Sequence, residues 1–496
     1  MNIFNSRASG ILMHISSLPG NTGIGTLGKH SYDFVDFLKK SGQTYWQILP
    51  ICPTSYGDSP YQSFSTFAGN PYFIDFELLE KDGYLSAKDY ENRDWGDTES
   101  YVDYGKLYIE RNKVFEIIQS NFEKKIPADY EDFCEKNKYW LDDFALFMAI
   151  KDKHNGIAFD YWEEDIRCRK PEAVKKWTKD CKHRIEYYKI LQYLFYHQWF
   201  LLKDYANKNG IYIIGDIPIY VAADSADVWT NPENFILDEN NRPIEVAGCP
   251  PDGFSADGQL WGNPVYDWKA MKKNNYKWWK ARLAASLKIY DVIRIDHFRG
   301  FDSFYAIPYG SKNAKIGEWK DGPGIDLFNE LKKEFGEMQI IAEDLGFLTD
   351  SVRKLLKDSG YPGMKVLQFA FDSRDGGNDY LPVKYEKNTV VYTGTHDNDT
   401  IKGWMNAANP SDIDFAMDYL RITDKSKLPS ELMLAGLSSV SNTCILTMQD
   451  LIGLGSEARM NTPSTVGNNW KWRAKENQIN DDIASWLLKY TKIYGR

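Results

Sequence analysis

The sequence lacks the patterns that mark several large classes of protein. It has no CxxC pair, and its six cysteines do not lie at zinc-binding spacing from one another or from histidine. These cysteines are Cys52, Cys134, Cys168, Cys181, Cys249 and Cys444. No run of about 18 apolar residues occurs, and the opening stretch MNIFNSRASG lacks the apolar segment of a signal peptide. We therefore expect free thiols, a cytoplasmic protein and no membrane partner.

Excess positive charge is also missing. The 496 residues include 60 Lys and Arg against 70 Asp and Glu, giving a net charge of −10. This balance argues against nucleic acid as a partner. Aromatic residues, in contrast, are abundant, with 16 Trp, 32 Tyr and 26 Phe. Most will build the core, but exposed Tyr and Trp rings also stack on the flat faces of sugars, so the composition gives a weak indication of a carbohydrate ligand.

Short apolar runs, each bounded by polar residues, Gly or Pro, predict eight strands with helical segments between them. The runs span 10–16, 44–51, 211–220, 290–296, 338–345, 364–371, 389–397 and 443–451. Alternation of strands and helices indicates parallel pairing, and eight is the number that closes a (β/α)₈ TIM barrel. An open doubly wound sheet is the alternative, but no GxGxxG motif follows the first run.

The spacing between these runs is uneven. Roughly 160 residues separate the second run from the third and about 70 separate the third from the fourth, where a βα unit needs only a few dozen. We therefore expect one catalytic barrel over 1–496, with inserted subdomains at approximately 52–205 and 222–285. The second insertion includes a Pro- and Gly-rich loop at 249–268, and a loop of this length without regular structure is usually functional.

The stretch YDVIRIDHFRGF, residues 290–301, begins as an apolar strand and ends in charged residues. Side chains alternate along a strand, so Arg294 and Asp296 share one face while Ile293 and Ile295 share the other. In a barrel, polar groups at the carboxyl ends of the strands form the active site. A cation beside Asp296 would keep its carboxylate ionised, as a nucleophile or an electrostatic stabiliser requires.

Three other predicted strands carry acids at or near their carboxyl ends. They are Asp216 in the third run, Glu343 and Asp344 in the fifth, and Asp397 in the seventh, where His396 precedes Asp397 and Asp399 follows. One acid at a strand end is common, because strand ends face solvent. Their joint occurrence, with Arg and His among them, predicts a single acidic site at the barrel mouth.

Two kinds of chemistry use several carboxylates in this way. Binding of a divalent metal is one, since Asp, Glu and His ligate such ions. Retaining glycoside cleavage is the other, and it needs a nucleophilic carboxylate and a protonated acid about 5–5.5 Å apart. Asp296 suits the nucleophile, and Glu343 suits the acid because the apolar residues before it favour a dry site and a raised pKa. Asp397 could hold sugar hydroxyls, with His297 and His396 donating hydrogen bonds to sugar oxygens.

Several longer stretches make the sequence similar to the amylomaltase family, the 4-α-glucanotransferases or disproportionating enzymes of the α-amylase clan. The stretches are RASGILMHISSLPG, YGDSPYQSFSTFAGNPYFID, GDIPIYVAADSADVW, PPDGFSADGQLWGNPVYDW, VIRIDHFRGF, IIAEDLG, GMKVLQFAF, YTGTHDNDT and RMNTPSTVGNNWKWR. They span almost the whole chain, and the set in this order is highly specific. AEDLG or RIDHFRG alone would indicate only the wider clan.

The resemblance implies a role for each matching position. Asp296 matches the nucleophile that forms a β-glucosyl ester, Glu343 the general acid/base and Asp397 the transition-state stabiliser. Tyr61 and Asp216 match residues near the −1 sugar, and Arg294 and His396 match partners around the three acids. Trp261, Phe254 and Ser255 fall in a loop over the glucan, and Tyr56 matches a second glucan contact. His297 and Asp372 complete the predicted substrate-binding residues. No metal and no cofactor are expected.

We therefore expect a 4-α-glucanotransferase that moves segments of α-1,4-glucan between maltooligosaccharides, starch or glycogen by a retaining double displacement. A retaining α-1,4-glucan hydrolase is the alternative enzyme, and a catalytically silent glucan-binding protein is the alternative outside enzymes. The resemblance implies a barrel without a C-terminal β-sandwich, and a monomer or weak homodimer.

Overall fold

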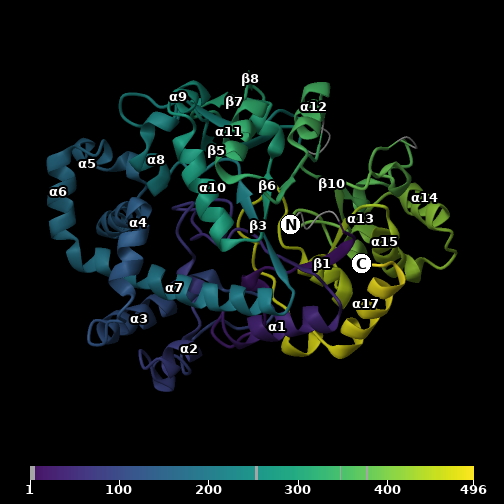
Figure 1. Ribbon diagram of the computed structural model, residues 1–496, viewed down its shortest axis with the longest axis horizontal. Helices are drawn as coiled ribbons and strands as arrows, with labels where there is room; N and C mark the ends of the chain where they lie inside the picture. Colours follow the sequence, from purple (N-terminus) through teal and green to yellow (C-terminus); the bar gives the residue numbers. More distant parts are fainter. Residues whose placement is uncertain (1–5, 252–254, 347, 376–377) are drawn as a thin grey trace.

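A closed barrel of eight parallel strands forms the centre of the molecule in the computed structural model, which describes residues 6–251, 255–346, 348–375 and 378–496 (Figure 1). Around the barrel the strands are β1 (Ala8–Leu12), β12 (Thr443–Thr447), β11 (Thr389–Tyr392), β10 (Gly363–Val366), β9 (Ile340–Ala342), β6 (Val292–Asp296), β3 (Tyr212–Pro218) and β2 (Tyr45–Gln47). Each predicted run overlaps one of them. The predicted TIM barrel is confirmed, and the open sheet is wrong.

The barrel closes where β1 pairs with β12, in the register Ala8↔Thr443. On its other side β1 pairs with β2, and a side chain at Gly10 would meet the Cβ atom of Tyr45 at 2.4 Å. Every residue of β1, β11 and β12 is buried. Burial on both faces explains why these runs are continuously apolar, because helices cover the outside of a parallel barrel while side chains fill its inside.

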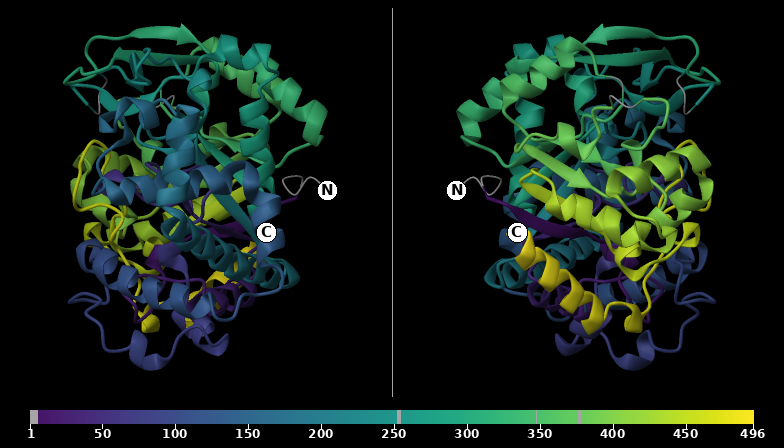
Figure 2. Two further views of the ribbon diagram at one scale, coloured as in Figure 1. Left: turned by 90° about the vertical axis from the view of Figure 1, so that its left-hand side faces the viewer. Right: turned by 90° about the vertical axis from the view of Figure 1, so that its right-hand side faces the viewer.

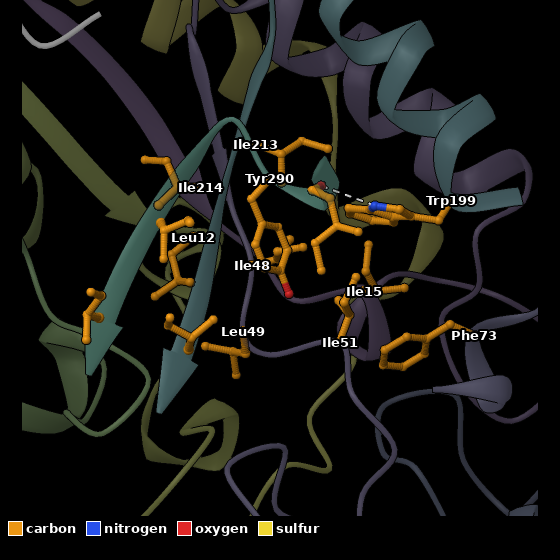
Figure 3. Close-up of a cluster of buried hydrophobic side chains, with 14 of the residues drawn as sticks. Leu12, Ile15, Ile48, Leu49, Ile51, Phe73, Trp199, Ile213, Ile214 and Tyr290 are labelled. Carbon is orange, nitrogen blue, oxygen red and sulfur yellow. Dashed lines mark hydrogen bonds between the residues drawn. The ribbon is translucent and has the colours of Figure 1, made fainter. Parts of the chain in front are cut away.

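Figure 3 shows part of the core, where side chains from β1, β3 and the segment after β2 meet the long helix α7 (Lys182–Lys208). Ten labelled residues form this part of the core: Leu12, Ile15, Ile48, Leu49, Ile51, Phe73, Trp199, Ile213, Ile214 and Tyr290. Trp199 of α7 donates a 3.2 Å hydrogen bond from Nε1 to the carbonyl of Ile289. The helix is thus fixed to the barrel by both apolar packing and a buried hydrogen bond.

Between β2 and β3 the chain is mostly helical. The helices there are α2 (Phe76–Lys81), α3 (Tyr104–Phe122), α4 (Tyr130–Lys153), α5 (Glu164–Arg167), α6 (Pro171–Asp180) and α7. They gather at the left of Figure 1, and α4 packs along α7. Asp103 begins α3 as a capping residue, accepting a hydrogen bond from the Lys106 backbone N–H.

A four-stranded antiparallel sheet, in the order β5-β4-β7-β8, lies beside the barrel at the top of Figures 1 and 2. Its strands are β4 (Glu245–Cys249), β5 (Gln259–Pro264), β7 (Ser303–Pro308) and β8 (Glu318–Asp321). The expectation of irregular structure throughout 249–268 is therefore wrong, because 259–264 pairs with β4. Positive φ angles at Gly258 and Gly262 interrupt the strand pattern locally and hide it in the sequence.

The remaining helices are α1 (Lys29–Lys40), α8 (Ala226–Thr230), α9 (Trp268–Lys273), α10 (Lys277–Ile289), α11 (Ile325–Phe335), α12 (Asp350–Ser359), α13 (Ile401–Ala407), α14 (Pro410–Leu420), α15 (Leu428–Ser438), α16 (Met448–Ile452) and α17 (Asp481–Ile493). Of these, α1 lies between β1 and β2 and the others follow β3 and the later strands. Arg496, just past α17, donates a 2.9 Å hydrogen bond to the carbonyl of Ala8, so the last helix is tied to the first strand. Within the described ranges, no helix has the length and apolarity needed to cross a membrane.

Candidate active site

The carboxyl ends of four barrel strands bring together the acids that the sequence singled out. Asp216 lies near the end of β3, Asp296 ends β6, Glu343 directly follows β9, and Asp397 lies in the segment after β11. In the register of β3 and β6, Asp216 is opposite Arg294 and Pro218 is opposite Asp296. Parallel pairing therefore places these side chains at one end of the barrel.

Arg294 links two of these acids. Its Nη1 atom lies 2.6 Å from Oδ2 of Asp216 and 3.1 Å from Oδ1 of Asp296. The Arg294 side chain is only 3% exposed. Burial opposes its charge, but the carboxylates of Asp216 and Asp296 outweigh this effect and raise the pKa of the guanidinium well above its usual range. A permanent cation thus lies in ion-pair contact with Asp296.

An aromatic wall, made of Tyr61, His396 and Trp470, borders this ion-pair network. The hydroxyl of Tyr61 donates a 2.8 Å hydrogen bond to Oδ2 of Asp216. The rings of Tyr61 and His396 stack with centroids 5.0 Å apart, and the Trp470 ring lies 5.8 Å from that of His396. Burial raises the pKa of the Tyr61 phenol well above its usual range, so this group remains a hydrogen-bond donor.

Glu343 is held by two backbone N–H groups. Oε2 accepts from His297 at 2.7 Å, and Oε1 accepts from Leu345 at 2.9 Å. Burial raises the pKa of Glu343 to about 8, and the negative charge of Asp296 adds to the rise, while Arg294 and the two N–H groups oppose it. Glu343 is therefore mostly protonated at neutral pH, which is the state a general acid needs.

His297 directly follows Asp296 in the sequence, and its backbone N–H contacts Glu343. Its backbone adopts the left-handed conformation with φ of 51°, which is uncommon for a residue with a side chain. The imidazole meets the Trp261 ring edge-on, with centroids 4.8 Å apart. Burial lowers the pKa of His297 to about 4, against the opposing influence of Asp296, so the ring is neutral at neutral pH.

Asp397 is positioned by groups from the segment that follows β12. Asn461 donates a 2.6 Å hydrogen bond from Nδ2 to Oδ1, and Arg459 donates a 2.7 Å hydrogen bond to the Asp397 carbonyl. Nε2 of His396 lies 3.4 Å from Oδ2. The sequence analysis missed Asn461 and Arg459. Both lie in RMNTPSTVGNNWKWR, which was recognised only as part of a resemblance, because an isolated Asn or Arg in a loop gives no chemical pattern of its own.

His14 was also missed as a site residue. It lies two residues after β1 and accepts a 3.2 Å hydrogen bond at Nδ1 from the Leu49 backbone N–H. Burial, together with a smaller contribution from His396, lowers the pKa of His14 to about 3. A neutral ring that accepts at Nδ1 carries its hydrogen on Nε2. There was little signal for it in the sequence, since His14 lies within the predicted run 10–16 and no acid accompanies it there.

Three other predicted substrate residues, Tyr56, Asp372 and Ser255, have surroundings of their own. Tyr56 is 76% exposed. Asp372 forms a 2.7 Å ion pair with Arg374, whose hydrogen bonds lower the pKa of the carboxyl to about 2. Ser255 donates a hydrogen bond to the Gly258 carbonyl at 2.7 Å, and Phe254 lies outside the described residues. Among the interactions that the structure gives for the described residues, none joins Tyr56 or Asp372 directly to the acids at the barrel mouth.

The arrangement also bears on the metal alternative. Across the described ranges, no group of three or more His, Cys, Asp or Glu side chains is placed to hold a metal ion. Between Asp216 and Asp296 lies the Arg294 guanidinium. Two acids in contrasting settings, with Asp296 paired to a cation and Glu343 in a drier place, instead match the division of roles in retaining glycoside chemistry.

Comparison with known proteins agrees with this geometry. A family model described as 4-alpha-glucanotransferase matches residues 13–479. The 4-alpha-glucanotransferase of Clostridium butyricum is 50% identical over 486 residues, covering 98% of this chain and 100% of that protein. The enzyme of the same description from Thermus thermophilus is 44% identical, with 96% of each chain covered.

Solved structures give the same result. The amylomaltase from Streptococcus agalactiae, determined in complex with acarbose, superimposes with a TM-score of 0.97 at 44% identity, over 99% of each chain. The amylomaltase from Corynebacterium glutamicum has a TM-score of 0.78 at 18% identity, covering 99% of this chain and 76% of that one, and this second likeness shows the fold alone. The family model thus matches most of the chain, and relatives 44–50% identical align over nearly their full length. These matches show that the chain belongs to the 4-alpha-glucanotransferase family, glycoside hydrolase family 77.

Proposed function

We propose that this 4-α-glucanotransferase moves segments of α-1,4-glucan between maltooligosaccharides, starch or glycogen by a retaining double displacement, with Asp296 as nucleophile and Glu343 as acid and base. The observation that carries the proposal is the contrast between these two neighbouring acids. Asp296 forms an ion pair with Arg294 at 3.1 Å, whereas the pKa of Glu343 is raised to about 8. One acid is thereby prepared to attack and the other to donate a proton.

In the first half of the reaction, Glu343 protonates the glycosidic oxygen while a carboxylate oxygen of Asp296 attacks C1. The bond between C1 and the glycosidic oxygen breaks, and the piece with the new non-reducing end leaves. The donor segment remains as an ester on Asp296. The charge of Asp296 is lost in this ester, which removes one of the causes that raise the pKa of Glu343. Glu343 is then better suited to stay ionised and act as a base.

In the second half, the 4-hydroxyl of an acceptor glucan takes the place of the leaving piece. Glu343 accepts the proton of that hydroxyl, the hydroxyl oxygen attacks C1, and the bond to Asp296 breaks. Two inversions give net retention of configuration. Both acids return to their starting states, so the cycle needs no further reactant.

Asp397 and the aromatic wall would hold the sugar during both halves. We assign Asp397 to the hydroxyls of the reacting ring, because Asn461 and His396 hold its carboxylate in place. The wall of Tyr61, His396 and Trp470 offers a surface for the ring and keeps Asp216 paired to Arg294. Asp216, His297 and Asp372 complete the proposed contacts to glucan.

Transfer requires that sugar, and not water, reaches the ester. We assign this discrimination to the 249–268 segment, with Trp261, Ser255 and Phe254 as the covering residues. Trp261 is well placed for the role, since its ring lies against that of His297, whose backbone holds Glu343. Closure over the site excludes water, and contacts to the acceptor orient its hydroxyl for attack.

Two further assignments belong to the same proposal. Tyr56, with most of its side chain exposed, would contact glucan at a second place away from the acids. The protein would act in the cytoplasm, a proposal supported by six cysteines that form no disulfide in the described part of the chain. It would be a monomer or weak homodimer. Sedimentation of the purified protein over a range of concentrations tests the oligomeric state.

Incubation with maltotriose alone tests the proposed reaction. We expect a ladder of longer maltodextrins together with free glucose, while the total number of reducing ends stays nearly constant. A rise in reducing ends in step with bond cleavage would instead identify a hydrolase. Glucan binding without any change of chain length would identify a silent binding protein.

A further inference from the structure

Gln62 occupies a short, well-anchored turn beside the active site. It directly follows Tyr61, whose hydroxyl binds Asp216. The Gln62 carbonyl accepts a 2.9 Å hydrogen bond from the Ser55 N–H, and an antiparallel bridge joins Thr54 to Ser63. The backbone of this residue is therefore fixed, and its side chain projects from a rigid base.

The Gln62 amide reaches a different segment of the chain. Nε2 donates hydrogen bonds to Oδ1 of Asn263 at 3.0 Å and to the Trp261 carbonyl at 3.3 Å. Asn263, which is buried, in turn donates from Nδ2 to the Val221 carbonyl at 2.8 Å. One side chain thus joins the segment after β2 to β5, and through Asn263 to the segment after β3.

The residues that Gln62 contacts form an irregular part of β5. In the ladder with β4, Gly248 pairs with Leu260 and Val246 pairs with Pro264, and the register shifts between these pairs. Three residues of β5, 261–263, therefore face a single residue of β4. Bulges of this kind re-aim side chains and leave some backbone groups outside the ladder. Gln62 bonds to both ends of this bulge, where the ladder does not hold the strand.

We propose that Gln62 is a positioning residue that fixes the Trp261 bulge over the active site, and that it thereby controls how the glycosyl ester divides between sugar and water. The inference rests on the proposed covering role of Trp261. Trp261 packs on His297, and His297 holds the proposed acid Glu343. We call the two hydrogen bonds from Gln62 the clamp. Without the clamp, the bulge would move more freely, which would open the ester to water and weaken the orientation of the acceptor.

The clamp also joins the two halves of the site. On one side, Tyr61 connects through Asp216 to Arg294 and the nucleophile. On the other, Gln62 connects through Trp261 to the residue that holds the acid. Because Tyr61 and Gln62 are adjacent, the same turn holds the aromatic wall beside the nucleophile and Trp261 beside the acid.

Two variants of Gln62 test the proposal. Gln62→Ala removes both hydrogen bonds, and Gln62→Glu keeps the size but turns a donor into a carboxylate that faces two acceptor oxygens. With maltotriose as substrate, we expect either variant to raise the ratio of hydrolysis to transfer by about three- to tenfold, the effect of losing one or two hydrogen bonds. The KM for added acceptor should rise, while kcat for donor cleavage stays within about twofold.

Two control variants separate this inference from its alternatives. Gln192→Ala removes a matched pair of side-chain hydrogen bonds, to the N–H and carbonyl of Gly69. It should lower the unfolding temperature and leave the hydrolysis-to-transfer ratio unchanged, and an equal shift in that ratio would overturn the inference. Trp261→Ala should raise the ratio at least as much as the Gln62 variants.

The outcomes distinguish the clamp from the cover. If Trp261→Ala shifts the hydrolysis-to-transfer ratio but the folded Gln62 variants do not, the positioning role of Gln62 is wrong and the covering role of Trp261 stands. If Trp261→Ala also leaves the ratio unchanged, the covering role itself fails. If Gln62→Glu has the hydrolysis-to-transfer ratio and the acceptor KM of the wild type, the donor function assigned to the amide is refuted. This outcome is decisive even if Gln62→Ala is too unstable to assay.

Discussion

The backbone N–H of His297 donates a 2.7 Å hydrogen bond to Oε2 of Glu343, and it does so from a left-handed conformation with φ of 51°. Left-handed backbone costs a residue with a side chain roughly 1–2 kcal/mol, so the surrounding structure must maintain it. His297 directly follows Asp296. A single peptide unit therefore connects Asp296, the proposed nucleophile, to the N–H group that orients the proposed acid. The backbone, rather than another side chain, sets the position of this N–H group.

Replacement of Asp296 tests the nucleophile. Asp296→Asn should lower transfer by about 10³-fold or more, because the amide cannot form the ester, while glucan binding remains close to that of the wild type. Transfer is measured by following maltotriose disproportionation, and binding by calorimetry with a long maltodextrin. Turnover near the wild-type level in this variant would exclude the assignment of Asp296.

The pH dependence of activity should report Glu343. Its raised pKa of about 8 means that the acid form is present at neutral pH and is lost as the pH rises. The value of kcat/KM, which reflects the free enzyme, should therefore fall on an alkaline limb centred near pH 8. Initial rates with a short maltodextrin between pH 6 and 10 check this prediction. A profile that stays flat to pH 10 would show that Glu343 is not the acid of the first step.

The same pKa has a consequence for stability. Glu343 has a folded-state pKa above the ordinary value of 4.5, so the folded state is favoured most when this group is protonated and loses stability as the pH rises from about 4.5 to about 8. Glu343→Gln removes this loss. The stability of the variant relative to the wild type should rise by roughly 4 kcal/mol between pH 5 and pH 9, as measured by denaturant unfolding. An equal difference at both pH values would contradict the proposed burial cost.

The barrel could be predicted from the sequence because its strands are buried on both faces. Every residue of β1 and of β12 is buried, which leaves continuous apolar runs that stand out from the polar segments around them. Two strands of the antiparallel sheet, β5 and β8, were missed for the opposite reason. Much of β8 is exposed, and β5 is interrupted by a bulge and by Gly262, so neither shows a clear period.

The acids could be predicted because each lies beside an apolar run. The residues that hold these acids could not be predicted in this way. Asn461 approaches Asp397 from a segment 64 residues away, and only the closed barrel brings the two together. Gln62 and Asn263 are uncharged residues that meet across 201 positions of sequence. Contacts of this kind depend on long-range packing, and neither residue type nor spacing indicates them.

Asn461 provides a test of how Asp397 is held. Asn461→Ala removes the 2.6 Å hydrogen bond to the carboxylate and should lower kcat by about 10–100-fold, the usual range for a hydrogen bond to a charged group, with a smaller effect on donor KM. Asp399→Asn is the matched control, because the Asp399 carboxylate accepts from Ser456 and from the Thr400 N–H. That variant should keep kcat within about threefold. A loss in the control as large as in Asn461→Ala would mean that the whole segment, and not Asp397 alone, sets the rate.

The second glucan contact can be tested separately from the chemistry. The Tyr56 side chain is 76% exposed, so Tyr56→Ala removes little packing and should change the unfolding temperature by less than about 2 °C. If Tyr56 forms a separate contact for long glucans, rates with maltotriose should remain close to the wild type. With long glucan, loss of an aromatic platform should raise the apparent KM by about five- to tenfold. Tyr56→Trp, which keeps an aromatic face, should restore most of that loss. If the two substrates respond alike to Tyr56→Ala, Tyr56 acts within the catalytic site and the assignment of a separate contact is wrong.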